Sequence, residues 1–351
     1  MKIIDGSAGE GGGQIFRTSL TLAMCLGELV QINNIRAGRK RPGLLRQHLA
    51  CLKAASEICG AQVTGDVLGS QAVTFKPAKI KSGNYQFSIA TAGSTTLIFQ
   101  TVVLPLFRAS GVSTLSLSGG THNGMAPSFE FISKSFLPLM ERIGFYVDVE
   151  LHSYGFYPAG GGQWRATVSP VGHVKALELL EPQEVVSKKA IAIASKVPFH
   201  VCERELQQVE NRCNWGRNSL ENREVNSVGP GNMLSLQVAT NACVNVFDVF
   251  GEKRVSAERV ANKAIDMLRC FEAAKVAVNE HLADQLLLPL VLGGGGRFTT
   301  SRPLKHLLSN IDVIEQFLPG HVNLSQVSDS VWMVEVRGQI STVVNYSEVP
   351  D

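Results

Sequence analysis

The stretch LLRQHLACLKAASEIC (residues 44–59) and the two short runs after it decide the fold. Its apolar residues recur at helical spacing, and Gly60 is the kind of residue that ends a helix. AQVTG (61–65) and SQAVTFKP (70–77) have the length and the β-branched content of strands. The local unit is therefore a helix followed by two strands.

The same order returns twice along the chain. Each copy is a helix that ends at a glycine, followed by two strands: FEFISKSFLPLMERI (129–143), YVDVELH (146–152) and QWRATVSP (163–170), then PLKHLLSNIDVIEQFL (303–318), HVNLSQV (321–327) and VWMVEVRG (331–338). A strand precedes each helix, which gives a repeated β-α-β-β module of about forty residues. One such unit cannot bury both faces of its helix layer, so the copies should pack around one another in an α/β (α+β) fold.

Residues 181–277 do not follow the β-α-β-β order of the repeated module. They hold a long polar stretch and then two strands and a helix, at NMLSLQVAT (232–240), NVFDVFGE (245–252) and VSAERVANKAIDMLRCF (255–271). We interpret this segment as a smaller inserted α/β domain, which leaves 1–180 and 278–351 as one large domain of modules. A continuous single domain is the alternative.

The composition indicates a compact protein. Of 351 residues, 44% are hydrophobic and only 18% are charged, which argues against disorder. The longest apolar runs are too short to cross a bilayer, and the start has no signal-peptide pattern, so we expect the cytosol. The seven cysteines have no CxxC spacing, and we interpret them as reduced, mostly core residues rather than a zinc site or a disulfide framework.

The glycine-rich start GSAGEGGGQIFRTSL (6–20) runs into a helix. It is neither a Walker A loop nor a dinucleotide fingerprint, since no GK[ST] follows and Gln14 occupies the last position of the fingerprint. Glycines let a ligand approach the backbone, and a helix start attracts anions. Glu10 would oppose an anion unless a divalent cation lay between them, so it is either a magnesium-type ligand or an acid in the first helical turn.

A cluster of basic residues precedes the helix of 44–59, in IRAGRKRPGLLRQH (35–48). Arginine forks match phosphate oxygens in pairs, and the cluster has no acidic residue. We favour contact with phosphate or an RNA backbone over a solvated loop, with Gln47 and His48 adding directional hydrogen bonds.

His306 lies in the first turn of the predicted helix 303–318, off an apolar stripe that we assign to Leu304, Leu307, Leu308, Ile311, Ile314 and Phe317. The helix dipole there disfavours imidazolium and keeps the ring neutral and nucleophilic. Spacing alone leaves two interpretations, an inert surface histidine and a covalent nucleophile. The glycines at 293–296 indicate a hinge on their own, and the family pattern described below changes that interpretation to room beside a nucleotide.

Five motifs together resemble the RNA 3'-terminal phosphate cyclase family in order and spacing: EGGGQIFRTSL (10–20), IRAGRKRPGLLRQHLA (35–50), GFYPAGGG (155–162), HLADQLLLP (281–289) and GGGGRFTTSRPLKHLLSN (293–310). The resemblance runs from Asp5 to about Gly338. It implies repeated modules similar to those of enolpyruvyl transferases. It also implies ATP-dependent conversion of an RNA 3'-phosphate to a 2',3'-cyclic phosphate, through a histidyl-AMP intermediate and an RNA-adenylate, with Mg²⁺ or Mn²⁺.

The resemblance also implies residue roles. His306 matches the nucleophile, and Glu10 matches the metal-coordinating acid. The remaining matches are arginines near the phosphates (Arg17, Arg36, Arg39), residues that the active site needs (Gln47, His48), and the ATP pocket (Gln100, His281, Leu282, Ala283, Asp284, Gln285). Two positions depart from the family pattern, because His281 replaces a frequent tyrosine and Tyr154 replaces a basic residue.

Two competing functions are considered. A non-catalytic, cyclase-like RNA-binding protein of ribosome assembly would lack the nucleophilic histidine, whereas His306, Glu10 and Arg17 are all present. An enolpyruvyl transferase would show two similar halves, which the unequal insertion opposes.

Overall fold

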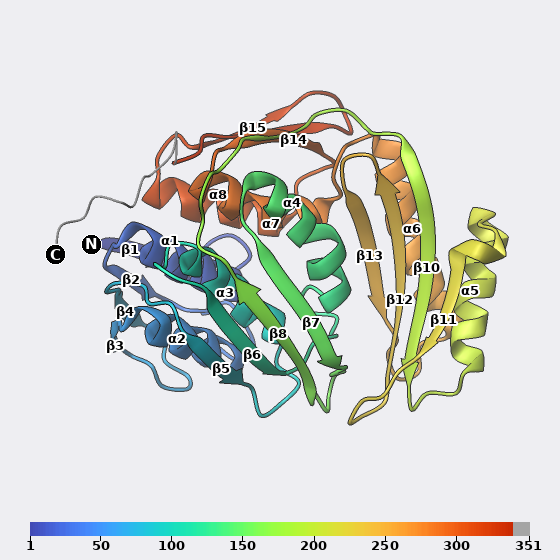
Figure 1. Ribbon diagram of the computed structural model, residues 1–351, viewed down its shortest axis with the longest axis horizontal. Helices are drawn as coiled ribbons and strands as arrows, with labels where there is room; N and C mark the ends of the chain where they lie inside the picture. Colours follow the sequence, from blue (N-terminus) through green and yellow to red (C-terminus); the bar gives the residue numbers. More distant parts are fainter. Residues whose placement is uncertain (340–351) are drawn as a thin grey trace.

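The first module contains the stretch that opened the sequence analysis. The computed structural model describes residues 1–339 of the chain. Its first sheet has the order β1-β2-β4-β3, with β1 and β2 parallel and the other pairs antiparallel (Figure 1). In chain order the elements are β1 (Lys2–Asp5), α1 (Gly13–Leu26), β2 (Val30–Asn33), α2 (Arg46–Cys59), β3 (Gln62–Thr64) and β4 (Val73–Lys76).

The second module repeats this arrangement. Its sheet has the order β5-β6-β8-β7, again with a parallel first pair. Its elements are β5 (Asn84–Ser88), α3 (Thr95–Leu106), β6 (Ser113–Gly119), the π-helical η1 (Phe131–Phe136), α4 (Leu137–Ile143), β7 (Val147–Ser153) and β8 (Gly162–Val168).

The third module is divided by the inserted segment. Its sheet has the order β15-β16-β14-β9, in which β9 runs parallel to β14. Its elements are β9 (Leu177–Leu179), α7 (Glu280–Leu292), β14 (Gly296–Thr300), α8 (Lys305–Phe317), β15 (Val322–Gln326) and β16 (Trp332–Val336).

These three sheets confirm the α/β fold class and its repeats, and they show that the repeat is longer than expected. Each module begins with an additional strand and helix, so the unit is β-α-β-α-β-β. The first helix of each unit is the crossover that two parallel strands require. The predicted β-α-β-β run is the second half of this unit, and the leading strands β1 and β9 are too short to show alternation in the sequence.

The helices of the modules pack against one another, as Figure 1 shows for the layer between the sheets. Helix α1 contacts α2, α3 and α8, and α7 contacts α8. One large hydrophobic core runs through all three modules, including Phe16, Phe99 and Phe298, all nearly fully buried. Residues from distant parts of the chain therefore meet around α1.

The inserted segment forms a fourth sheet, of order β11-β10-β12-β13. Its elements are β10 (Val185–Ser195), α5 (His200–Cys213), the short 3-10 helix η2 (Arg217–Ser219), β11 (Leu220–Glu224), β12 (Gly231–Thr240), β13 (Val244–Phe250) and α6 (Ala257–Ala274). This sheet shares a separate core with α5 and α6. The limits 181–277 stay a prediction for the extent of the domain.

The glycines at 293–296 do not provide room beside a nucleotide, so that interpretation is wrong. A Cβ on Gly294 would lie 2.6 Å from the carbonyl carbon of Lys175, and a Cβ on Gly296 would lie 2.1 Å from the Leu177 oxygen. These glycines let β14 approach β9 and the segment before it. Gly293 to Gly295 precede β14 and Gly296 begins it, whereas His306 follows the strand. Within residues 1–339, no helix has the length and apolar character needed to cross a membrane.

Candidate active site

His306 is the second residue of α8, which follows an extended N-cap at Leu304. Its side chain is 46% exposed. Nδ1 lies 2.5 Å from Oε1 of Gln14 and 3.3 Å from Oε2 of Glu10. Both neighbours come from the start of the chain, so the site forms where the first and third modules meet.

The predicted apolar stripe of this helix is wrong at Leu308, which is 42% exposed. Ser309 and Asn310 are buried instead. The Asn310 side chain accepts from Thr18 Oγ1 at 2.7 Å and donates to the Asp284 carbonyl at 3.2 Å. Because α8 packs against α1 and α7 through these polar contacts, its buried face is rotated from the one that hydrophobicity alone indicates.

Glu10 lies in the glycine-rich loop before α1, which begins at Gly13 and has no acidic residue in its first turn. The interpretation of Glu10 as a first-turn acid is therefore wrong. Its backbone N–H donates to Ser309 Oγ at 3.0 Å, and its carboxylate is 3.4 Å from the Arg39 guanidinium. Arg39 also donates to the Glu10 carbonyl at 2.9 Å. These contacts hold the Glu10 carboxylate beside His306.

The N-terminal turn of α7 supplies another part of the site. Asn279 caps the helix, because its side chain accepts from the backbone N–H groups of His281 and Leu282. Desolvation, then the charges of His306 and Lys263, lowers the pKa of His281. His281 and His306 are therefore close enough to interact.

One helical turn later, the buried Asp284 accepts a hydrogen bond from Gln285, which in turn accepts one from Gln100 of α3. Burial raises the pKa of Asp284 to about 7, against the lowering effect of hydrogen bonds from Gln285 and Gln14 and of the Arg17 charge. The side chains of Leu282 and Ala283 belong to the hydrophobic core. The predicted run therefore faces the site through His281, Asp284 and Gln285.

His48 lies in the first turn of α2, almost fully buried. Its Nδ1 accepts from the backbone N–H of Leu45 at 3.1 Å. Burial, followed by the charges of Arg17 and Arg36, lowers the pKa of His48 to about 3. The ring is therefore neutral, and because Nδ1 accepts, its proton is on Nε2.

The predicted phosphate residues around His48 do not all point the same way. Arg17 is half-buried, and its pKa is lowered by desolvation against the opposing charges of Cys51, Glu10 and Asp284. Arg36 folds onto its own loop and donates to the carbonyls of Arg41 and Gly43. Gln47 donates to the Ser94 carbonyl at 2.9 Å. Arg36 and Gln47 thus hold backbone segments in place, while Arg17 and Arg39 lie beside Glu10.

Gln14 is the site residue that sequence reasoning missed. It is buried, and it connects His306 with Asp284, whose carboxyl group also hydrogen-bonds to it. Its spacing from Arg17 and Thr18 was the available signal, because residues three and four apart share a helix face. A polar side chain in the first turn, on the face of a candidate arginine, could have been included on that basis.

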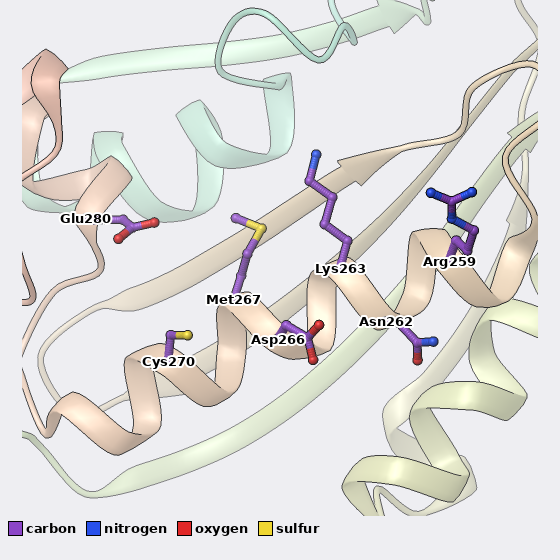
Figure 2. A pocket seen from close by; sticks show the side chains of 7 residues that line it. All are labelled: Arg259, Asn262, Lys263, Asp266, Met267, Cys270 and Glu280. Atoms are coloured by element: carbon purple, nitrogen blue, oxygen red, sulfur yellow. The ribbon is translucent and has the colours of Figure 1, made fainter.

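A groove of about 490 Å³ lies next to His281, along the exposed face of α6. Figure 2 shows its lining side chains projecting from α6 and from the start of α7: Arg259, Asn262, Lys263, Asp266, Met267, Cys270 and Glu280. It shares Met267, Cys270 and Glu280 with a small cavity that His281 lines. Because the groove carries charges of both signs, its charge does not define an anion site.

The acidic residues of the site do not form a complete metal centre. Within the described residues 1–339, no group of three or more His, Cys, Asp and Glu side chains is placed to hold a metal ion. Mg²⁺ in nucleotide enzymes is commonly bound by one or two carboxylates together with substrate phosphates. Glu10 could be such a carboxylate. It lies 3.3 Å from His306, so a phosphate held at this histidine would also lie near the Glu10 carboxylate.

Comparison with known proteins gives a consistent result. The family model described as "RNA 3'-terminal phosphate cyclase" matches residues 8–324. The chain is 45% identical over 327 residues to the RNA 3'-terminal phosphate cyclase of Koribacter versatilis, covering 93% of this chain and 92% of that protein. It is 44% identical over 342 residues to that of Salmonella paratyphi C, covering 97% and 96%.

A solved structure of lower similarity is the enolpyruvyl transferase NikO from Streptomyces tendae. It shares 9% sequence identity and a TM-score of 0.39, and the match covers 97% of this chain and 48% of that one.

Proposed function

The chain belongs to the RNA 3'-terminal phosphate cyclase family, and we propose that it carries out this reaction through His306 as a covalent nucleophile. The overall activity is the conversion of an RNA 3'-terminal phosphate to a 2',3'-cyclic phosphate at the expense of ATP. The observation that carries the His306 assignment is the contact of its Nδ1 with Gln14, on a half-exposed ring. That contact leaves Nε2 as the ring atom available for bond formation.

The proposed reaction has three transfers. Nε2 of His306 attacks the α-phosphorus of ATP, a P–N bond forms, and pyrophosphate leaves with the electrons of the broken P–O bond. An oxygen of the RNA 3'-phosphate then attacks that phosphorus, and the P–N electrons return to Nε2. Finally the 2'-hydroxyl oxygen attacks the 3'-phosphorus, its proton passes to solvent, and AMP leaves. The histidine splits one difficult substitution into easier ones.

Positive groups at the site support binding of two substrates that carry phosphate groups, ATP and the RNA 3'-end. Arg17 and Arg39 lie beside Glu10, and the starts of α1 and α8 meet there. Helix starts direct free N–H groups toward anions, and arginine pairs with phosphate oxygens two at a time. We assign these groups, together with Arg36, to the ATP phosphates and the RNA 3'-phosphate.

The ATP pocket and the metal follow from the same geometry. His281, Asp284, Gln285 and Gln100 form a polar edge beside His306, which we assign to the nucleoside. Glu10 would hold Mg²⁺ or Mn²⁺ together with phosphate oxygens, and the ion would offset the charge of the departing pyrophosphate. We place the reaction in the cytosol, where free thiols such as those of all seven cysteines persist.

The decisive experiment is covalent labelling with α-labelled ATP and Mg²⁺. The wild-type chain should form an acid-labile, alkali-stable protein-AMP bond, and His306→Ala should not. His173→Ala, at an exposed loop position, is the matched control and should label like the wild type. Labelling of His306→Ala would contradict the nucleophile assignment. Absence of labelling in the wild type, together with RNA binding, would favour the non-catalytic cyclase-like alternative.

A further inference from the structure

A chain of hydrogen-bonded side chains lies behind His306. Its Nδ1 is 2.5 Å from Gln14 Oε1, and Gln14 is hydrogen-bonded to the Asp284 carboxyl. On the other side of Asp284, Gln285 donates to its carboxylate, and Gln100 donates to Gln285. The chain joins α8, α1, α7 and α3, so four helices hold it in place.

The chemistry of Asp284 determines which side chain donates and which accepts in this row of hydrogen bonds. At pH 8, above the pKa of about 7 for Asp284, its carboxyl group is mostly ionised and only accepts hydrogen bonds, whereas a carboxamide both donates and accepts. Asp284 therefore accepts a hydrogen bond from the NH₂ group of Gln14, and the Gln14 oxygen points toward His306. Because that oxygen only accepts, the His306 proton must be on Nδ1, which leaves the Nε2 lone pair free.

We propose that Gln14 is the positioning residue that fixes the reactive tautomer of His306, and that Asp284 fixes the orientation of Gln14. The inference rests on the proposed function, since the tautomer matters only if Nε2 attacks phosphorus. Glu10 is a second acceptor for Nδ1, but it lies farther away at 3.3 Å and also pairs with Arg39. Gln14 makes the shorter contact and is buried, so it determines the proton position.

Three variants test this order of donors and acceptors. Gln14→Met keeps the length of the side chain and removes the acceptor. Asp284→Asn leaves one acceptor oxygen at this position, which Gln285 uses. The introduced NH₂ group then faces Gln14, which reverses the Gln14 amide and presents its NH₂ to His306. The double variant Gln14→Glu with Asp284→Asn restores the order. In it, the amide introduced on α7 donates to one oxygen of the carboxylate introduced on α1, while the other oxygen accepts from Nδ1.

The measurement is the single-turnover rate of protein-AMP formation at pH 8 and its dependence on ATP concentration. Loss of the correct tautomer in a catalytic histidine costs on the order of 10²- to 10⁴-fold in rate. We expect such a loss for Gln14→Met with the KM for ATP within about threefold of wild type, because positioning acts on the chemical step. The double variant should recover at least about tenfold over Asp284→Asn, a gain of about 1.4 kcal/mol.

The free protein gives a readout that does not depend on turnover. With ¹⁵N-labelled histidine, the His306 resonances should report a protonated Nδ1 in the wild type and a protonated Nε2 in Asp284→Asn. Gln14→Met that labels at the wild-type rate, or a double variant no faster than Asp284→Asn, overturns the inference. Both results leave the proposed function intact as long as His306→Ala fails to label, whereas labelling of His306→Ala removes both.

Discussion

Two helices of this molecule occupy equivalent places in their modules and carry a histidine in the first turn. Helix α2 begins after Leu45 and contains His48, and α8 begins after Leu304 and contains His306. Both N-cap leucines have extended backbone, with φ of −89° and −75°. The repeat thus produces the same backbone conformation at both helix starts. The Nδ1 atoms of the two rings nevertheless face opposite partners, a donor at His48 and an acceptor at His306.

The partner of Nδ1 is what separates the two histidines. In His48 it is the backbone N–H of Leu45, which forces the proton onto Nε2. In His306 it is the Gln14 oxygen, which places the proton on Nδ1. One ring can therefore only donate at its outer nitrogen, and the other can attack. Position in a repeat does not determine a histidine's chemistry, since the tertiary partner sets the tautomer.

Amide substitutions should separate the two roles most strongly. An amide can replace a hydrogen-bond donor but not a nitrogen nucleophile. His306→Gln should therefore lower protein-AMP formation by about 10³-fold or more. His48→Gln should stay within about tenfold of wild type, while His48→Ala should lose about 10- to 100-fold, the equivalent of one hydrogen bond to a charged group. Labelling rates of the three variants check this.

Equal losses for His48→Gln and His48→Ala would show that the donor at Nε2 has no role. Labelling of His306→Gln within about tenfold of the wild-type rate would contradict the difference between the two rings.

Much of the fold could be predicted because it is encoded locally. The helix predicted over residues 44–59 is observed as Arg46–Cys59, and the one predicted over 303–318 as Lys305–Phe317. Helix α5 was missed because it buries only a narrow stripe of Cys202, Glu205, Leu206 and Val209 within a polar segment. Such a stripe is hard to distinguish from a loop.

The site was less accessible to sequence reasoning, since its contacts join distant residues. Gln14 and His306 are separated by 292 positions, and no local period connects them. Leu308 was placed in the core because of its hydrophobicity, while Asn310 is buried through hydrogen bonds with Thr18 and Asp284. The role of Arg17 comes from the resemblance, while those of Glu10 and Arg39 also follow from the glycine-rich loop and the basic cluster. All three stay predictions.

Gly13→Ala should disturb His48 without touching its sequence. A Cβ at this position would lie 2.3 Å from Nε2 of His48 and 3.0 Å from a guanidinium nitrogen of Arg17. His48 is buried and Arg17 is half-buried, so we expect a loss of stability of about 1–3 kcal/mol, typical of overpacking. RNA cyclisation should fall by about 10-fold or more if the Nε2 proton of His48 is a donor that the site uses.

Gly38→Ala is the matched control, because nothing lies within 4 Å of a Cβ there. Denaturant unfolding and cyclisation rates measure both variants. A Gly13→Ala protein with wild-type stability and activity would show that the His48 ring is free to move.

The pH dependence of stability should also distinguish the rings. Burial and the charges of Arg17 and Arg36 lower the pKa of His48 to about 3 in the folded protein, against an ordinary value of 6.5. Between these values the unfolded chain binds a proton that the folded chain excludes, so the stability contribution is full above pH 6.5 and is lost as pH falls. At pH 5 the loss is about 2 kcal/mol.

His48→Gln removes this titration, so the variant should lose about 2 kcal/mol less stability than the wild type between pH 7 and pH 5. Denaturant unfolding at the two pH values provides the comparison. Parallel losses in the two proteins would mean that His48 becomes protonated in the folded state, and its fixed tautomer would then be untenable.

The smallest expected effect concerns the charge around each ring. His48 faces arginines, whereas His306 has the Glu10 carboxylate 3.3 Å from Nδ1. Glu10→Gln keeps an oxygen that can accept from Nδ1 but loses the charge that a cation needs, so the two roles of Glu10 separate.

If Glu10 binds Mg²⁺ with the ATP phosphates, the Mg²⁺ concentration for half-maximal labelling should rise about tenfold while the rate at saturating Mg²⁺ changes little. An unchanged Mg²⁺ requirement with a lower maximal rate would instead assign Glu10 to His306 alone. The negative charge would then act on the nucleophile, and the metal would have to be bound through the phosphates without it.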